Sequence, residues 1–126
     1  LGEATSLTAD SAGPKRGEIW WVNLDPTVGA EIRKRRPAVV VSSDAVGKLP
    51  LKLIAPITEW KDAFAPNIWH VRIEPDSVNG LDKVGAVDTL QVRGVDTRRF
   101  VSKLGAVSAP LMEEIAAAIA AVVEYQ

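Results

Sequence analysis

The sequence predicts a mainly β, barrel-like α+β domain that ends in a helix, and three observations support this prediction. Short runs rich in β-branched and aromatic residues recur along the chain, separated by turns rich in glycine, proline and aspartate. The segment 108–122 instead repeats apolar residues at helical spacing. The length of 126 residues leaves room for one domain with a single modest core.

Composition narrows the classes of function. The formal net charge of -1 argues against the broad basic surface that long duplex nucleic acid needs, but it allows a short phosphate-binding site. The sequence contains no cysteine, which excludes disulfides and thiol nucleophiles and fits a reducing cytoplasm. No apolar run approaches the length of a membrane span, so we expect a cytoplasmic protein without a membrane partner.

The chain is expected to begin with a tail and then enter the sheet. Residues 1–14 are rich in small and polar residues and show no period, which predicts a flexible tail before a domain at 15–126. The segment 18–24 is expected to be the first strand, with Ile19 and Trp21 on one face. A proline then ends this strand.

Two more strands follow after a loop. The run 38–41 is continuously apolar, as expected for a strand buried on both faces. A turn at 44–50 leads into a strand at 51–58. Because Pro56 lacks the N–H that a sheet ladder requires, we expect it to mark an edge strand or a bulge.

The middle of the chain combines a long loop with a half-buried strand. Residues 59–67 are expected to form a surface loop that carries Trp60 and Phe64 and can act as a recognition lip. The segment 68–74 alternates apolar and polar residues, which is typical of a strand with one buried face. Its His70, the single histidine, is expected on the strand surface or at a dimer edge.

The C-terminal part should complete the sheet and then turn helical. A short β region is expected at 84–92, one helical turn capped by Asp96, and a last strand at 101–107. Ser108 has the character of an N-cap, and a proline follows in the first turn of the expected helix.

The loop between the first two strands concentrates positive charge. Residues 33–36 are four consecutive cations, bounded by Gly29 and Pro37, in a protein with fifteen Lys and Arg residues. Such a cluster indicates an anion-binding site, although charge alone more often marks a solvated face. Pro37 restricts Arg36 to extended backbone geometry, so this last cation should be held more firmly than its neighbours.

Four blocks of the chain, in order, resemble the MazF/PemK (PemK/Kid) toxin endoribonucleases of type II toxin–antitoxin systems. They are 16–26 (RGEIWWVNLDP), 29–37 (GAEIRKRRP), 56–58 (PIT) and 90–96 (LQVRGVD). The resemblance extends from Lys15 to about Tyr125. It implies a PemK/Kid/CcdB-like fold, an SH3-like small barrel with a C-terminal α-helix. It also implies a homodimer that cuts single-stranded RNA at short sequences without metal or cofactor and is neutralised by a cognate antitoxin.

The resemblance assigns catalytic roles to two residues. Arg36 stands where the family keeps its catalytic arginine, and Thr58 where it keeps its catalytic threonine. In such a reaction the ribose 2′-hydroxyl attacks the neighbouring phosphorus, giving a 2′,3′-cyclic phosphate and a 5′-hydroxyl. A guanidinium offers a rigid fork of donors to the phosphate oxygens. Because arginine stays protonated, the identity of the general base remains open.

Further residues are expected to bind RNA, and they are Glu31, Arg33, Lys34, Arg35, Trp60, Gln91 and Arg93. Trp60 is equally compatible with packing and with base stacking. Gln91 and Arg93 can contact RNA or cap the turn before Asp96.

Two departures separate the chain from the family pattern. The family often has Glu-Gln-Gly-Gly in the first loop, whereas residues 31–34 read Glu-Ile-Arg-Lys. The acidic residue that some members carry before the glutamine is Leu90 here, and Asp88 lies two positions earlier. The first departure should alter base contacts, and the second leaves the role of Asp88 open.

Two rival functions stay open beside the endoribonuclease. One is a non-enzymatic toxin of the same fold that binds DNA gyrase, and the other is a catalytically silent module that binds RNA or antitoxin. The Arg36 and Thr58 pair favours the enzyme over the gyrase-binding toxin, which leaves this pair unused. One histidine and scattered carboxylates give no metal-ligand spacing, and a two-histidine ribonuclease mechanism is excluded.

Overall fold

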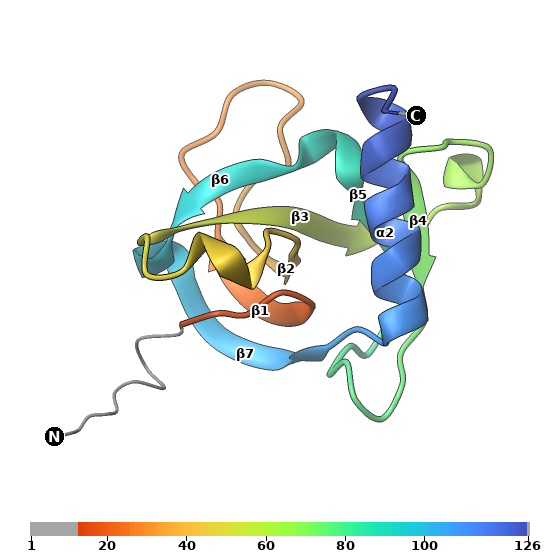
Figure 1. The fold of residues 1–126 in the computed structure, drawn as a ribbon. Helices are drawn as coiled ribbons and strands as arrows, with labels where there is room; N and C mark the ends of the chain where they lie inside the picture. Colours follow the sequence, from red (N-terminus) through yellow and green to blue (C-terminus); the bar gives the residue numbers. More distant parts are fainter. Residues whose placement is uncertain (1–12, 126) are drawn as a thin grey trace, which may run out of the picture.

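The computed structural model describes residues 13–125, which form seven strands, four 3₁₀ turns and one α-helix (Figure 1). The strands are β1 (Glu18–Asn23), β2 (Arg35–Val40), β3 (Leu51–Glu59), β4 (His70–Ile73), β5 (Gly85–Asp88), β6 (Arg93–Asp96) and β7 (Phe100–Ala106). The 3₁₀ turns are η1 (Asp44–Val46), η2 (Asp62–Phe64), η3 (Thr89–Gln91) and η4 (Thr97–Arg99), and the helix is α2 (Ala109–Val122). Of the tail predicted at 1–14, residues 1–12 lie outside the described part.

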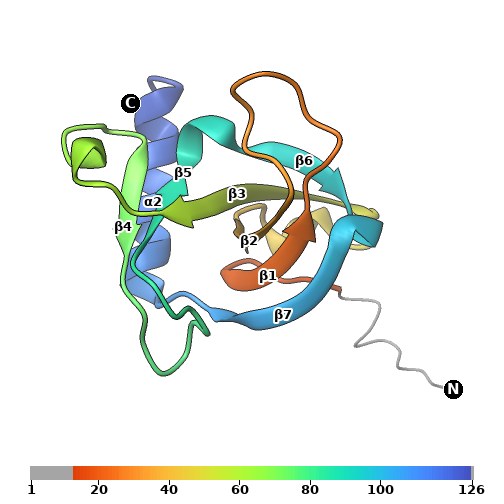
Figure 2. The same ribbon diagram turned by 180° about the vertical axis from the view of Figure 1, so that it is seen from behind.

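The strands form one antiparallel sheet that coils on itself (Figures 1 and 2). Its order is β4-β5-β3-β2-β1-β7, and β6 pairs with β3 off this path. The predicted mainly β fold with a C-terminal helix is confirmed. The sheet differs from a closed barrel because the path of paired strands ends at β4 and β7 without joining them.

Strand β3 is the centre of the sheet, so the expectation for Pro56 was wrong. β3 pairs with β2 on one side, and on the other it pairs first with β6 and then with β5. The β6 pairing reaches Ile54, and the β5 pairing starts at Ile57. Pro56 is buried in the gap between these two partners, where the exchange of strands tolerates a missing ladder N–H.

In strand β1 the burial of side chains does not simply alternate from one residue to the next. Its pairing with β7 shifts register between Ile19 and Trp20 and again between Trp21 and Val22. As a result Ile19 and Val22 are both fully buried, although they are an odd number of residues apart, and Trp21 is only half-buried. Bulges re-aim side chains in this way.

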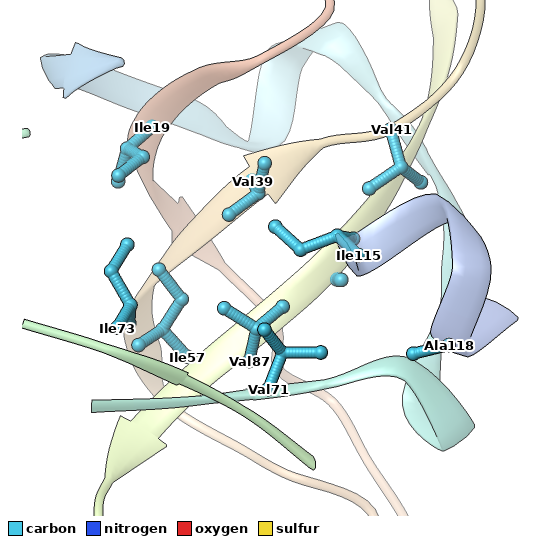
Figure 3. Packing of buried hydrophobic residues seen from close by; sticks show 10 residues of the cluster. Ile19, Val39, Val41, Ile57, Val71, Ile73, Val87, Ile115 and Ala118 are labelled. Atoms are coloured by element: carbon cyan, nitrogen blue, oxygen red, sulfur yellow. The ribbon is translucent and has the colours of Figure 1, made fainter. Parts of the chain in front are cut away.

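Two apolar clusters hold the domain together. The larger one lies between the sheet and α2, where Ile115 reaches in among Val39, Val41 and Val87 (Figure 3). The smaller one packs β1, β2 and β3 against β6, with Val22, Leu24 and Ile54 at its centre. Each fully buried aliphatic side chain of this kind contributes about 1.5–3 kcal/mol.

Helix α2 follows the local signals in the sequence. The Ser108 hydroxyl accepts a hydrogen bond from the Leu111 N–H at 3.2 Å, as an N-cap does. Ile115 and Ala118 are buried, and the helix packs against β4 and η3. It thereby supports the two elements that border the candidate site.

Candidate active site

The base of the β1–β2 loop is tied together by main-chain and side-chain bonds. The Leu24 N–H donates to the Lys34 carbonyl at 2.9 Å, and the Lys34 N–H donates to the Asp25 carboxylate at 3.0 Å. Lys34 adopts a left-handed φ of 71°, a conformation that costs a non-glycine residue about 1–2 kcal/mol. This is a position where the resembling family often has glycine. The loop therefore keeps a glycine-like backbone while it carries a cation.

Two residues from distant sequence hold the rest of this loop. Gln91 accepts from the Ile32 N–H at 2.6 Å and donates to the Ala30 carbonyl at 3.2 Å. Arg93 donates to the Leu24 carbonyl at 3.1 Å. Both polar ends of the Gln91 amide are thus occupied by the loop main chain. We call the two bonds made by Gln91 the Gln91 clamp.

The four cations are presented differently from one another. Arg33, Lys34 and Arg35 are exposed, whereas Arg36 is half-buried and lines the two hollows described below. The Nε of Arg36 donates to the Arg33 carbonyl at 3.3 Å. Within residues 13–125 its two terminal nitrogens make no hydrogen bond or ion pair, so they can bind an anion.

Arg36 and Thr58 lie opposite each other on neighbouring strands. Strands β2 and β3 pair Ala38 with Pro56. Continuing this antiparallel register by two residues places Arg36 opposite Thr58. Both side chains are half-buried, and the Thr58 hydroxyl makes no hydrogen bond within the described part of the chain. The structure thus brings together the two residues for which the sequence predicts catalysis.

Two hollows meet at Arg36 and Thr58. Both hollows are lined by these two residues and by Glu59. The first, which we call the η3 hollow, has a volume of about 510 Å³ and is completed by Ile32, Lys61, Phe64, His70, Asp88 and Gln91. The second, which we call the β4–β5 hollow, has about 310 Å³ and is completed by Trp21, Pro37, Ile57, Leu81, Asp82, Lys83 and Val84. A phosphate at Arg36 would therefore have open space on both sides.

The His70 side chain is buried in the wall of the η3 hollow, so its predicted position on the strand surface was wrong. The side chain is 7% exposed, and its ring stacks on Phe64 with 3.9 Å between ring centroids. Nδ1 lies 3.1 Å from the amide nitrogen of Asn67, and Nε2 lies 3.5 Å from the Asp88 carboxylate. The turn η2 folds Phe64 over the ring, and strand alternation could not reveal this.

The neighbours of His70 favour one tautomer of its ring. With the Asn67 amide nitrogen facing Nδ1, the tautomer that suits both neighbours has its hydrogen on Nε2, on the side of Asp88. Both ring nitrogens are therefore engaged within the protein. His70 orients Asp88 instead of presenting a free base to the cleft.

Asp88, whose role the sequence left open, connects His70 to the Gln91 clamp. Its carboxylate accepts from the Leu90 N–H at 3.0 Å and thereby caps η3. That turn carries Gln91, which holds the β1–β2 loop. An aspartate just before a short turn was a sequence signal for the cap, but nothing in the sequence indicated the buried histidine partner.

The remaining predicted residues lie around the cleft. Trp60 packs edge-on against Phe64 with 5.9 Å between centroids, and the Arg72 guanidinium lies 5.3 Å from its ring. Glu31 turns back on its own loop, where its carboxylate accepts from the Val28 N–H at 2.8 Å. Trp60 is half-buried beside the η3 hollow, and Glu31 is exposed at the loop tip.

The acids with shifted pKa values lie in the scaffold outside the two hollows. Burial raises the pKa of Glu18, but hydrogen bonds from the Lys15 N–H, Trp20 and Lys103 outweigh it and leave the pKa below its ordinary value. A hydrogen bond from the Arg98 side chain lowers the pKa of Asp96, which caps η4. The Glu18–Lys103 ion pair joins β1 to β7, and the Asp96–Arg98 ion pair lies within the turn η4 and its cap.

Neither a metal cluster nor a membrane helix is found among residues 13–125. In that part of the chain, no three His, Asp or Glu side chains are grouped to hold a metal ion. No helix in that part is both long and apolar enough to span a bilayer.

Comparisons with known proteins agree with this geometry. Endoribonuclease MazF9 of Mycobacterium tuberculosis is 32% identical over 107 residues, which cover 80% of this chain and 88% of that protein. Endoribonuclease MazF of Staphylococcus saprophyticus is 33% identical over 107 residues, which cover 83% and 87%.

Solved structures share the fold over most of their length. The crystal structure of MazF (Form-I) from Deinococcus radiodurans matches with a TM-score of 0.74 and 25% identity, covering 89% of this chain and 97% of that one. An endoribonuclease in complex with its cognate antitoxin from a mycobacterial species matches with a TM-score of 0.71 and 16% identity, covering 90% and 98%. The family model of the PemK-like, MazF-like toxins matches residues 15–123. The chain therefore belongs to the PemK-like, MazF-like toxin family of type II toxin–antitoxin systems.

Proposed function

We propose that the protein is a sequence-specific, metal-independent endoribonuclease that cleaves single-stranded RNA, with Arg36 and Thr58 as its catalytic residues. The observation that supports this most is the placement of both side chains in one cleft, opposite each other on β2 and β3. There the terminal nitrogens of Arg36 and the Thr58 hydroxyl have no partners among residues 13–125. The named endoribonucleases among its relatives support the same reaction class.

The proposed reaction needs no external nucleophile. The 2′-hydroxyl loses its proton and its oxygen bonds to phosphorus, while the bond from phosphorus to the 5′-oxygen breaks and that oxygen gains a proton. The products are a 2′,3′-cyclic phosphate and a 5′-hydroxyl. Negative charge grows on the non-bridging oxygens in the transition state. The terminal nitrogens of Arg36 and the Thr58 hydroxyl can donate to these oxygens, and preorganised donors of this kind contribute about 3–4 kcal/mol each.

His70 does not fit the role of general base in this arrangement. Its Nδ1 lies 3.1 Å from the Asn67 amide nitrogen and its Nε2 lies 3.5 Å from the Asp88 carboxylate, so both ring nitrogens face groups of the protein. Arg36 acts in this proposal as electrostatic stabiliser and proton-relay partner at the phosphate, and the general base stays unassigned.

The exposed cations should hold the RNA backbone. Arg33, Lys34 and Arg35 are exposed beside Arg36, and each phosphate contact releases a counterion and steepens the dependence of affinity on salt. Gln91 and Arg93 already bind the loop main chain, so they can contact RNA only by exchanging those partners. The same holds for Glu31 and its bond to Val28. Trp60 can offer a ring to a base at the edge of the η3 hollow.

We also propose a cognate antitoxin and a homodimer as partners. Solved relatives of the same fold include MazE–MazF complexes from Deinococcus radiodurans. An antitoxin segment that carries acidic residues would compete with RNA for the exposed cations of the β1–β2 loop. Light scattering on the purified toxin, alone and with antitoxin, measures both assemblies.

The proposed function is tested by mapping cleavage in a chelator. The purified protein is incubated with a long RNA and EDTA, and the new 5′ ends are sequenced and tested for a free hydroxyl. We expect cuts at one short motif, and a loss of at least about a hundredfold in rate for Arg36→Ala and Thr58→Ala. The matched control is Arg98→Ala, because Arg98 is an exposed arginine paired with Asp96 away from the cleft.

Three outcomes would contradict parts of this proposal. Intact RNA with measurable binding would favour a silent binding module, and inhibition of DNA gyrase without RNA cuts would favour a non-enzymatic toxin. Normal cleavage by Arg36→Ala, with circular dichroism unchanged, would overturn the assignment of the catalytic arginine.

A further inference from the structure

The β4–β5 hollow has the size and composition of a small-ligand site. Its volume of about 310 Å³ falls at the lower end of the range of such sites. Trp21, Pro37 and Leu81 line it with apolar surface, and the exposed Asp82 and Lys83 add opposite charges. It opens directly on the proposed catalytic pair, because Arg36 and Thr58 line it as well.

One wall of this hollow is fixed by a buried asparagine. Asn79 is 1% exposed, donates to the Glu74 carbonyl at 2.8 Å and accepts from the Leu81 N–H at 3.0 Å. It accepts also from the Asp76 N–H at 3.2 Å. Because both the nitrogen and the oxygen of the Asn79 amide are hydrogen-bonded, the backbone that leads into Leu81, Asp82 and Lys83 is held in one conformation.

The backbone of the same wall lies in close contact with the backbone of β7. Gly80 has a φ of 72°, and a Cβ added there would lie 2.2 Å from the Leu104 carbonyl oxygen. A Cβ on Gly105 would lie 2.1 Å from the Val78 carbonyl oxygen. Only glycine allows these two backbones to approach so closely. The hollow is therefore preformed, which lowers the conformational cost of binding.

The charges in the hollow select the kind of ligand. Two carboxylates, Glu59 and Asp82, and two cations, Arg36 and Lys83, line the hollow. When ionised, the carboxylates can only accept hydrogen bonds, so the surface beside them favours a group that donates. A planar ring that packs on Trp21 and Pro37 and carries an amino group satisfies both the apolar and the acidic surface. Lys83, exposed beside Asp82, can pair with a phosphate outside the hollow.

We propose that the β4–β5 hollow is a nucleobase subsite for the nucleotide on one side of the scissile phosphate, and that Asp82 selects a base with an exocyclic amino group. Adenine, cytosine and guanine carry such a group and uracil does not. Carboxylates read the cytosine amino group in the same way in protein–DNA complexes. The subsite rests on the proposed endoribonuclease function, since it is defined by a phosphate bound at Arg36.

The test uses the full-length protein and short RNA substrates that contain the mapped cleavage motif. All four bases are placed in turn on each side of the scissile bond, and kcat/KM is measured for the wild type, Asp82→Asn and Trp21→Leu. An uncleavable series with a 2′-deoxy sugar at the scissile nucleotide reports affinity alone, by fluorescence anisotropy. Glu113→Gln, an exposed carboxyl change on α2, is the matched control.

We expect the wild type to disfavour uracil at one of the two positions by about tenfold, which is the scale of a well-placed carboxylate contact to a base. Asp82→Asn should reduce this preference to less than about threefold and leave the other position unchanged, because an amide both donates and accepts. Trp21→Leu should raise KM for every base at the same position and leave kcat nearly constant. Thermal unfolding confirms that each variant is folded.

The possible failures can be told apart. A wild type that binds the 2′-deoxy series with the expected base preference but cuts no RNA refutes the proposed function and keeps the subsite. Cleavage with identical base preferences in wild type, Asp82→Asn and Trp21→Leu refutes the subsite alone. The subsite is also refuted if these changes weaken only antitoxin binding, or if the wild type binds no RNA.

Discussion

The two loops that border the cleft are held in opposite ways. The β1–β2 loop depends on side chains from distant sequence, because Gln91 and Arg93 bind its main chain. The β4–β5 loop depends on its own Asn79 and on close backbone contact with β7. A loop held by half-buried side chains can exchange its partners for a ligand more easily than a loop held by a fully buried amide. One side of the cleft is adaptable and the other is fixed.

The surroundings of the two loops strengthen this contrast. A hollow of about 500 Å³ lies between the β1–β2 loop and η3, lined by residues of both, so that loop has space beside it. Gly29, Ala30 and Glu31 at its tip are all exposed. On the other side, Asn79 is buried. We therefore expect RNA or antitoxin to rearrange the β1–β2 loop and to leave the β4–β5 wall in place.

The largest effect is expected on the fixed side. Asn79→Ala leaves the Glu74 carbonyl and the Leu81 N–H without their buried partner, and such losses cost about 1–3 kcal/mol each. We expect the free energy of unfolding to fall by about 2–4 kcal/mol, measured by urea denaturation. The matched control is Ser77→Ala, an exposed position in the same loop that should change stability little. A loss for Asn79→Ala as small as that of the control would show that this amide does not hold the wall.

A smaller loss is expected from Asp88→Asn, at the connection between His70 and η3. The Asp88 side chain is 10% exposed and binds both the His70 ring and the Leu90 N–H. An asparagine can accept only through its oxygen, so one of these two donors loses its acceptor. We expect about 1–2 kcal/mol less stability. NMR of the His70 ring should show a changed environment, and an unchanged spectrum would contradict the pairing.

Gln91→Ala tests the adaptable side. It removes the two bonds that hold Ile32 and Ala30, but the loop is largely exposed and water can replace them. We expect less than about 1 kcal/mol of lost stability and faster amide hydrogen exchange at Ile32. The RNA cleavage rate should fall by about tenfold, because the loop that leads to Arg36 is less ordered. Stability loss equal to that of Asn79→Ala would erase the contrast between the two loops.

Local signals in the sequence were sufficient for much of the fold. Runs of β-branched residues marked most of the strands, Ser108 marked the start of α2, and Asp96 marked η4, because caps and strand propensity depend on near neighbours. The β region expected at 84–92 is instead β5 followed by η3, and the sequence did not indicate β6. The resemblance to the family identified Arg36 and Thr58 as a pair. The register of β2 and β3 places the two residues opposite each other.

What the sequence did not reveal depends on contacts between distant segments. Gln91 and Ile32 are 59 residues apart, and no local rule connects them. The burial of His70 requires Phe64 to fold over it from η2, which alternation along a single strand does not report. The β4–β5 hollow likewise combines Trp21 of β1 with Asp82, and these two residues meet only once the sheet has coiled.

The smallest effect is expected from Lys34→Gly, which tests whether the cation or the backbone matters more in the adaptable loop. Lys34 has a φ of 71°, so glycine relieves about 1–2 kcal/mol of strain, but glycine also adds about 0.5–1 kcal/mol of conformational entropy to the unfolded chain. The two terms nearly cancel, and the free energy of unfolding should change by less than about 1 kcal/mol. The loss of one exposed charge should lower the slope of log affinity against log salt by about 0.7 for single-stranded RNA. An unchanged salt slope would mean that Lys34 contacts no phosphate, and the adaptable side would then bind RNA through Arg33 and Arg35 alone.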